Sequence, residues 1–218
     1  MHILITAGPT REPLDPVRFI SNRSSGKMGY ALARAALSHN HSIRLIAGPV
    51  QLPPPPGAQV LGVETADDML QAVRQNLDWC DVLIMAAAVA DWRPAACSSH
   101  KLKKSEMAAH LTLEKTRDIL QTVRPAKGTR LFVGFAAETG DPVPEARRKL
   151  AEKGLDLVVA NDVTSPGAGF EVDTNRVTLI AADGTVTPLP LMSKDEVAKR
   201  IIAWVEQTRG YSAKPRNP

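Results

Sequence analysis

A serine- and glycine-rich segment near the amino terminus has the composition of an anion-binding helix start. Ser24, Ser25, Gly26 and Gly29 lie at the beginning of a helix predicted over residues 25–39, which follows the first predicted strand and a long polar loop. The first N–H groups of a helix have no partner within it, and the helix dipole is positive at that end, so phosphate is stabilised there. An ordinary serine cap with glycines for close packing is the alternative, but the position after the first strand favours phosphate.

A second candidate segment follows the fourth predicted strand and consists of small residues, 86–90, that end at Asp91. Small side chains would let a ligand approach the backbone closely, and Asp91 would place one carboxylate at the rim of a site. Tight packing of a helix on the sheet, with Asp91 as a cap, explains the same residues equally well. Taken alone, the segment leaves both interpretations open.

Two groups of lysines could neutralise an anionic ligand. Residues 101–104 contain three lysines, and in an extended chain Lys101 and Lys103 share one face. Lys149 and Lys153 are spaced four residues apart on a predicted helix and also share a face. A solvated basic flap is the alternative for the first group, and ion pairing along the helix is the alternative for the second.

Composition excludes several classes of protein. The chain has 218 residues, a formal net charge of +4 and a sequence pI near 9.2. Because this modest excess is spread along the chain, it does not indicate a nucleic-acid binder, although it suits anionic ligands. Cys80 and Cys97 provide no disulfide framework and no zinc-binding spacing. With neither a signal peptide nor an apolar run of membrane-spanning length, the sequence predicts a cytoplasmic protein.

The elements that must position these residues alternate between short apolar strands and helices, which predicts a doubly wound, mostly parallel, Rossmann-like α/β sheet. We expect strands at residues 3–6, 43–47, 60–63, 82–88, 131–136 and 157–160, and helices at 25–39, 66–77, 142–154 and 194–207. A C-terminal β-hairpin and an extended flap complete the prediction. One nucleotide-binding domain would cover residues 1–208, followed by a disordered tail at 209–218. Ligands of such sheets bind beyond the carboxyl ends of the strands, where these motifs would meet.

A nicotinamide-dependent oxidoreductase of similar fold is the first alternative. Gly8 is followed by proline and a long loop rather than by a G-x-G-x-x-G fingerprint. The second strand ends at Gly48-Pro49, with no acid to bind an adenosine ribose. A nucleotide-sensing or scaffold protein that has lost its chemistry is the second alternative, and the presence of Asn22, Asp91 and Lys101 argues against it.

Several motifs in a fixed order resemble one enzyme family. Residues 5–22, ITAGPTREPLDPVRFISN, lead directly into SSGKMG at residues 24–29. The segment at 86–94, the Lys-x-Lys-Lys run at 101–104, GFAAET at 134–139 and ANDV at 160–163 then follow in order. Over roughly residues 3–207 the chain resembles bacterial phosphopantothenate–cysteine ligase, also called phosphopantothenoylcysteine synthetase.

The resemblance implies a reaction in two steps. The carboxylate of 4′-phosphopantothenate attacks the α-phosphate of CTP, giving an acyl-cytidylate and pyrophosphate, and the amine of L-cysteine then displaces CMP. The family implies Mg²⁺ that binds with CTP, and it identifies no particular metal ligand from the protein. It also implies a homodimer in coenzyme A biosynthesis, often joined to a flavin-dependent decarboxylase domain that is absent from these residues.

The resemblance also assigns roles to individual residues. Asn22 and Lys101 would be catalytic, and Arg18, Ala87, Ala88 and Asp91 would bind phosphopantothenate. The nucleotide would contact Ser24, Gly26, Gly29, Met85, Ala86, Ala87, Asp91, Lys101, Arg117, Asp118, Ile119, Leu120, Phe135, Lys149, Lys153 and Asn161. Arg117 departs from the proline of the family pattern, whereas the acid that follows it is kept.

Overall fold

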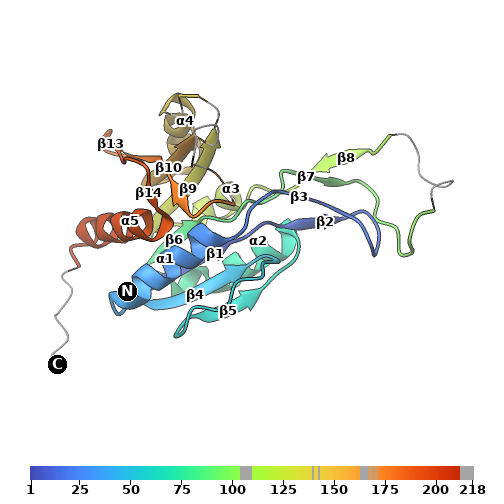
Figure 1. The fold of residues 1–218 in the computed structure, drawn as a ribbon, viewed down its shortest axis with the longest axis horizontal. Helices are drawn as coiled ribbons and strands as arrows, with labels where there is room; N and C mark the ends of the chain where they lie inside the picture. Colours follow the sequence, from blue (N-terminus) through green and yellow to red (C-terminus); the bar gives the residue numbers. More distant parts are fainter. Residues whose placement is uncertain are drawn as a thin grey trace.

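The computed structural model describes residues 1–103, 110–138, 140–141, 143–162, 167, 169 and 171–211. Its centre is an eight-stranded sheet in the order β13-β12-β10-β9-β6-β1-β4-β5 (Figure 1). These strands are β1 (His2–Ala7), β4 (Ser42–Ala47), β5 (Gln59–Gly62), β6 (Val82–Met85), β9 (Leu131–Glu138), β10 (Leu157–Asp162), β12 (Val177–Ala181) and β13 (Val186–Pro188).

The central strands are parallel, as their continuous apolar character predicts. β5, β4, β1, β6, β9 and β10 pair in parallel, whereas β12 and β13 add an antiparallel edge. The chain passes from β1 to β4 and β5 on one side and then returns to β6 on the other, so the strand order reverses between β1 and β6. In open α/β sheets, ligands bind at the carboxyl ends of strands beside such a switch point. The predicted doubly wound fold is confirmed.

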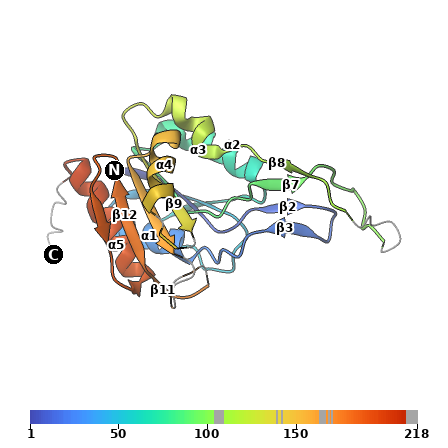
Figure 2. The ribbon, with the colours of Figure 1, turned by 90° about the horizontal axis from the view of Figure 1, so that it is seen from above.

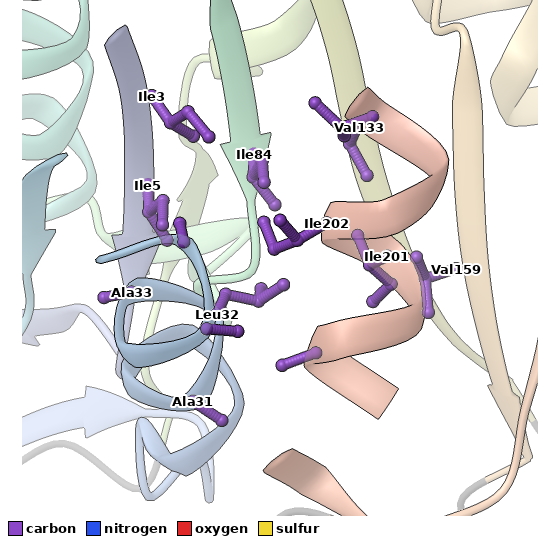
Figure 3. Packing of buried hydrophobic residues seen from close by; sticks show 14 of the residues in the cluster. Ile3, Ile5, Ala31, Leu32, Ala33, Ile84, Val133, Val159, Ile201 and Ile202 are labelled. Carbon is purple, nitrogen blue, oxygen red and sulfur yellow. The ribbon is translucent and has the colours of Figure 1, made fainter. Parts of the chain in front are cut away.

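Alternate residues of the buried strands face two different helical layers. Ile3 and Ile5 of β1 face α1 (Lys27–Ser38) and α5 (Lys194–Thr208), with Leu32 and Ile201 in the same cluster (Figure 3). The intervening Leu4 faces the other layer, which consists of α2 (Ala66–Asn76), α3 (Ile119–Val123) and α4 (Val143–Lys153). Because side chains of a strand alternate between its two faces, one strand contributes residues to both hydrophobic cores.

Two of the helices begin with capping boxes. Thr65 caps α2 and Ser193 caps α5, and in each case the side chain accepts a hydrogen bond from the third helical residue, whose own carboxylate binds back. The predicted cap at Thr65 is confirmed. Each box satisfies two N–H groups that the helix leaves unpaired.

A long arm projects from the carboxyl edge of the sheet (Figures 1 and 2). It contains two hairpins, β2–β3 (Arg11–Pro13 and Phe19–Ser21) and β7–β8 (Trp92–Pro94 and Leu113–Lys115), and β2 contacts β7. The second hairpin is the predicted extended flap, although residue 104 of the lysine run lies outside the described residues. The β2–β3 hairpin differs from the irregular polar loop that we expected, because its short strands have little apolar alternation to indicate them.

The remaining short elements were also not predicted. They are η1 (Leu77–Trp79), η2 (Arg124–Ala126) and the two-stranded sheet of β11 (Thr174–Asn175) and β14 (Met192–Ser193). Within the described part of the chain, every helix is too short or too polar to cross a bilayer.

The chain makes contacts with the sheet and its loops beyond the predicted domain end. Arg209 donates hydrogen bonds to the carbonyls of Thr129 and Asp81, and the Tyr211 ring packs edge-on against His41. These contacts involve the first residues of the predicted tail, and residues 212–218 lie outside the described part of the chain.

Candidate active site

A cavity of about 730 Å³ opens at the carboxyl ends of the central strands. Its wall is formed by the start of α1, the segment after β6, α3 with the residues before it, the end of β9, one face of α4 and the end of β10. The sequence-predicted residues in its lining are Asn22, Ser24, Gly26, Gly29, Met85, Ala86, Ala87, Ala88, Asp91, Arg117, Asp118, Ile119, Leu120, Phe135, Lys149, Lys153 and Asn161. Tertiary structure therefore gathers motifs more than 130 residues apart around one space.

The start of α1 has no side-chain cap, in contrast to the starts of α2 and α5. Gly26 occupies the N-cap position with φ of 78°, no described side chain makes a capping hydrogen bond there, and the first turn contains no acid. By contrast, α2 and α5 each have a capping box and two acids in the first turn. Since Gly26 and Lys27 also line the cavity, the N–H groups and the positive dipole of α1 face a space that can hold an anion.

Gly29 has a packing role that the phosphate interpretation did not include. A Cβ atom placed on Gly29 would lie 2.5 Å from the Ala7 Cβ and 3.0 Å from the Thr6 carbonyl oxygen. Glycine thus allows α1 to approach β1 closely, although the same residue also lines the cavity. Both interpretations of this glycine, close packing and a place in the ligand site, are compatible with the structure.

The alanine segment after β6 is held by two buried threonines. Thr6 Oγ1 accepts from the Ala87 N–H at 3.2 Å, and Thr10 Oγ1 accepts from the Ala90 N–H at 3.0 Å. Asn22 Nδ2 donates to the carbonyls of Ala88 and Val89, both at 3.1 Å. The predicted catalytic asparagine is therefore anchored directly on the predicted pantothenate segment.

The opposite wall contains a pair between α3 and α4. Asp118 caps α3 through Oδ1, which accepts from the Gln121 N–H at 2.9 Å, while its Oδ2 lies 2.8 Å from Lys153 Nζ. Lys149 Nζ is 3.8 Å from Glu145 Oε1, and the same carboxylate oxygen lies 2.5 Å from Arg148. Both lysines line the cavity as predicted, and Glu145 is engaged mainly by the arginine.

Arg117 is directed toward α2 by an ion pair. Its Nη2 lies 3.2 Å from Asp67 Oδ1, and the other oxygen of this carboxylate lies 2.9 Å from Arg93 Nη1. Arg93 also bonds Glu114 at 2.7 Å, and this bond is the main reason why its pKa is raised. The network ties the base of the arm to α2 beside the cavity.

Sequence reasoning missed three further lining residues of the cavity, namely Lys27, Asn175 and Lys194. Lys194 is 5% exposed, and its ammonium donates to the carbonyls of Gly169 and Val172. Burial, followed by the neighbouring Lys27 charge, lowers the pKa of Lys194 to about 8. In the sequence, Lys194 has the appearance of an ordinary polar residue in the first turn of an amphipathic helix, so no pattern there indicates that it is buried.

Two predicted site residues, Arg18 and Lys101, do not line the cavity. Both lie on the arm, where Arg18 forms an ion pair with Asp15 and donates to the Leu102 carbonyl at 2.9 Å. In this chain the guanidinium is directed toward the flap because a buried carboxylate binds it. Direct substrate binding by Arg18 stays a prediction.

The oxygen ligands that the cavity offers would hold a hard cation such as Mg²⁺ only together with the phosphates of a ligand. The described residues include no cluster of three or more acidic, histidine or cysteine side chains that could hold a metal. Asp91 supplies one carboxylate at the cavity, and Mg²⁺ commonly binds one or two carboxylates together with substrate phosphates.

Comparison with known proteins identifies the family. Residues 1–208 match the DNA/pantothenate metabolism flavoprotein C-terminal domain. The chain belongs to this family. It is 50% identical over 202 residues to the coenzyme A biosynthesis bifunctional protein CoaBC of Bacillus subtilis (strain 168), covering 92% of the chain and 50% of that relative. The chain thus spans about half the length of the curated relatives it matches.

Solved structures agree with this flavoprotein C-terminal domain. The crystal structure of the C-terminal domain of a CoaBC protein matches with a TM-score of 0.82 at 43% identity, covering 97% of this chain and 96% of that one. A Cab2 mutant (H337A) in complex with phosphopantothenate-cysteine shares the fold, with a TM-score of 0.76 at 17% identity, covering 95% and 88%. The family resemblance inferred from the motifs is confirmed, and these matches do not favour a nicotinamide-dependent oxidoreductase.

Proposed function

We propose that this chain is a ligase that joins 4′-phosphopantothenate to L-cysteine at the expense of CTP, in coenzyme A biosynthesis. The observation that carries the proposal is a single cavity that combines the uncapped start of α1 with the lysines of α4 and the Asn22-anchored alanine segment. Support comes from the coenzyme A biosynthesis relatives and from a fold neighbour that holds phosphopantothenate-cysteine.

In the first step, the pantothenate carboxylate oxygen bonds to the α-phosphorus of CTP while the bond to pyrophosphate breaks. A carboxylate is a poor electrophile, and a mixed anhydride gives its carbon a good leaving group. The N–H groups of the first turn of α1, beginning at Lys27, would stabilise charge on the phosphates, together with Lys149 and Lys153. Mg²⁺ bound with CTP would supply further charge neutralisation, and Asp91 is a cavity carboxylate that could hold it, whereas Asp118 is paired with Lys153.

In the second step, the cysteine amine bonds to the acyl carbon, and the bond to CMP breaks after a proton leaves the nitrogen. The tetrahedral intermediate carries an oxyanion, which needs a fixed hydrogen-bond donor. Asn22 lies against the alanine segment, where its two Nδ2 N–H groups donate to the carbonyls of Ala88 and Val89, and one of them would turn from its carbonyl to the oxyanion in this step. A site that holds both reactants in a fixed orientation needs no covalent enzyme intermediate.

The cytosine and ribose would lie between α3 and the end of β9. Ile119, Leu120 and Phe135 provide an apolar wall there, and Asp118 supplies a carboxylate. Asn161 is 7% exposed and its Oδ1 has no hydrogen-bond partner among the residues that the structure describes, so a ligand N–H or O–H group could satisfy it. This acceptor supports a polar ligand at the end of β10.

We also propose a homodimer, with the arm as the contact between subunits. Phe19, Trp92 and Leu113 on the two hairpins are between 40% and 47% exposed, and large apolar patches commonly mark protein interfaces. A flavin-dependent decarboxylase partner domain is a further proposal that rests on the half-length match to bifunctional relatives.

Pyrophosphate release tests the function directly. The purified chain is incubated with 4′-phosphopantothenate, Mg²⁺ and each nucleoside triphosphate in turn, with and without cysteine. Release that requires phosphopantothenate and prefers CTP, with amide formed only when cysteine is present, is the expected result. No release with any nucleotide, together with no measurable CTP binding, would contradict the proposal.

A further inference from the structure

A buried carboxylate joins the two hairpins of the arm. The Asp15 side chain is fully buried, and its Oδ1 accepts from the N–H groups of Val17 at 2.9 Å and Arg18 at 2.8 Å. Its Oδ2 accepts from Arg18 Nε at 3.0 Å, from Arg18 Nη2, and from the Leu102 N–H at 3.2 Å. Hydrogen bonding by Arg18, above all, holds the pKa of Asp15 well below its usual range, so this carboxylate is charged at neutral pH.

Both backbone polar groups of Leu102 are bound by this pair. Its N–H donates to Asp15, and its carbonyl accepts from Arg18 Nη2 at 2.9 Å. A further bond from the Ser98 N–H to the Leu14 carbonyl, at 3.0 Å, holds the same stretch of the flap against the loop of the β2–β3 hairpin. These contacts link segments that are more than 80 residues apart in sequence.

Fixing Leu102 in this way also fixes its neighbours. The N–H of Leu102 belongs to the peptide plane that contains the Lys101 Cα, and its carbonyl belongs to the plane that contains the Lys103 Cα. With both planes held by charged partners, the Cα positions of the two flap lysines are set while the Lys101 side chain stays exposed. A long flexible lysine side chain is most effective when only its own rotamers have to be ordered on binding a ligand.

We propose that Asp15 and Arg18 are positioning residues that hold the Leu102 backbone and thereby place Lys101 for the reaction. The catalytic part of this proposal rests on the proposed ligase function. Arg18 would then act on the substrate through the flap lysine, which accounts for its position outside the cavity lining.

Trypsin cleavage after Lys101 tests the positioning without any need for turnover. In Asp15→Asn, one of the two acceptor oxygens becomes an NH2 group and the negative charge is lost, so the side chain can no longer accept on both sides and loses its ion pair with Arg18. Cleavage of a native protein tracks the population of its locally open form, so we expect the cleavage rate after Lys101 to rise about tenfold or more. Asp183→Asn is the matched control, because Asp183 accepts from the Thr185 N–H at 2.8 Å in the distant β12–β13 turn.

A double-mutant cycle tests the catalytic consequence. Because Asp15 acts through Lys101, Lys101→Gln and the double variant Asp15→Asn/Lys101→Gln should have the same residual kcat/KM, whereas Asp15→Asn alone should lose about tenfold or more, with the loss mainly in kcat. Arg18→Gln should behave like Asp15→Asn, and since the Arg18 side chain is 34% exposed, this variant provides the test if Asp15→Asn fails to fold.

The outcomes separate this inference from the proposed function. Unchanged cleavage after Lys101 in Asp15→Asn and in Arg18→Gln would overturn the positioning, whatever the activity. Additive losses in the double variant would overturn the route through Lys101. A wild-type chain that neither releases pyrophosphate nor binds CTP would contradict the ligase proposal alone, because the cleavage experiment still reports on the flap.

Discussion

The Lys153 ammonium lies 2.8 Å from Asp118 Oδ2, and this contact joins the carboxyl-terminal end of α4 to the start of α3 across the edge of the cavity. The partner carboxylate is 33% exposed, so the pair is accessible to solvent and can be broken by a competing anion. A nucleotide phosphate that draws Lys153 away would leave Asp118 as the cap of α3.

Replacing Lys153 with methionine should weaken nucleotide use. Loss of one charge-assisted hydrogen bond costs about 1.5–3 kcal/mol, so we expect KM for the nucleotide to rise about tenfold or more. The measurement is the initial rate of pyrophosphate release against nucleotide concentration. Lys199→Met on the exposed face of α5 is the matched control and should leave KM unchanged. The same nucleotide KM in Lys153→Met and Lys199→Met would show that Lys153 does not bind the nucleotide.

Asn22→Asp should separate the two half-reactions. The substituted carboxylate cannot donate to the carbonyls of Ala88 and Val89, and it places negative charge where the oxyanion of the second step would form. We expect pyrophosphate release to persist while amide formation falls about a hundredfold or more, in line with the loss of one oxyanion donor. Pyrophosphate and phosphopantothenoylcysteine are quantified in the same reaction. Equal loss of both products would contradict the role of Asn22 in the second step.

Gly29→Ala should destabilise the fold. The added methyl group would meet Ala7 at 2.5 Å, and overpacking of this kind costs about 1–3 kcal/mol. Gly62→Ala is the matched control, because its added methyl group has no atom within 4 Å among the described residues and should change the free energy of unfolding by less than about 0.5 kcal/mol. Urea unfolding followed by circular dichroism compares the two variants. Equal midpoints would show that α1 can move away from β1 without cost.

Lys194 should make stability depend on pH in the alkaline range. Its pKa is about 8 in the folded protein against an ordinary value of 10.5, so between these values the unfolded chain binds more protons. The free energy of unfolding therefore rises with pH in this window, by at most about 1.4 kcal/mol per pH unit from this group.

Comparison with Lys194→Met isolates this contribution from other titrating groups. Urea unfolding at a series of pH values should show the wild-type protein gaining stability relative to the variant from pH 8 to 10.5, with Lys27 and Asp173 as the charged neighbours in both proteins. A difference that does not change with pH would mean that burial does not perturb this lysine.

Much of the scaffold could be read from sequence because its signals are local. The apolar runs of β1, β6 and β9 predicted buried parallel strands, and the Thr65 cap predicted the start of α2. The Asp183-Gly184 turn predicted the β12–β13 hairpin. By contrast, the β2–β3 hairpin and the short α3 have too few residues for a hydrophobic period, so only their contacts with distant segments define them.

By itself, the sequence determined the doubly wound fold, the family and most of the residues around the cavity, because strand and helix periodicity and ordered motifs are properties of consecutive residues. Tertiary structure alone decided how those residues are used: the Asp15–Arg18 pair binds the backbone of Leu102, which is more than 80 residues away in sequence, and Lys194 lies buried in the cavity wall. Burial and the pairing of charges depend on which distant segments meet, and this information is not contained in any short stretch of the chain.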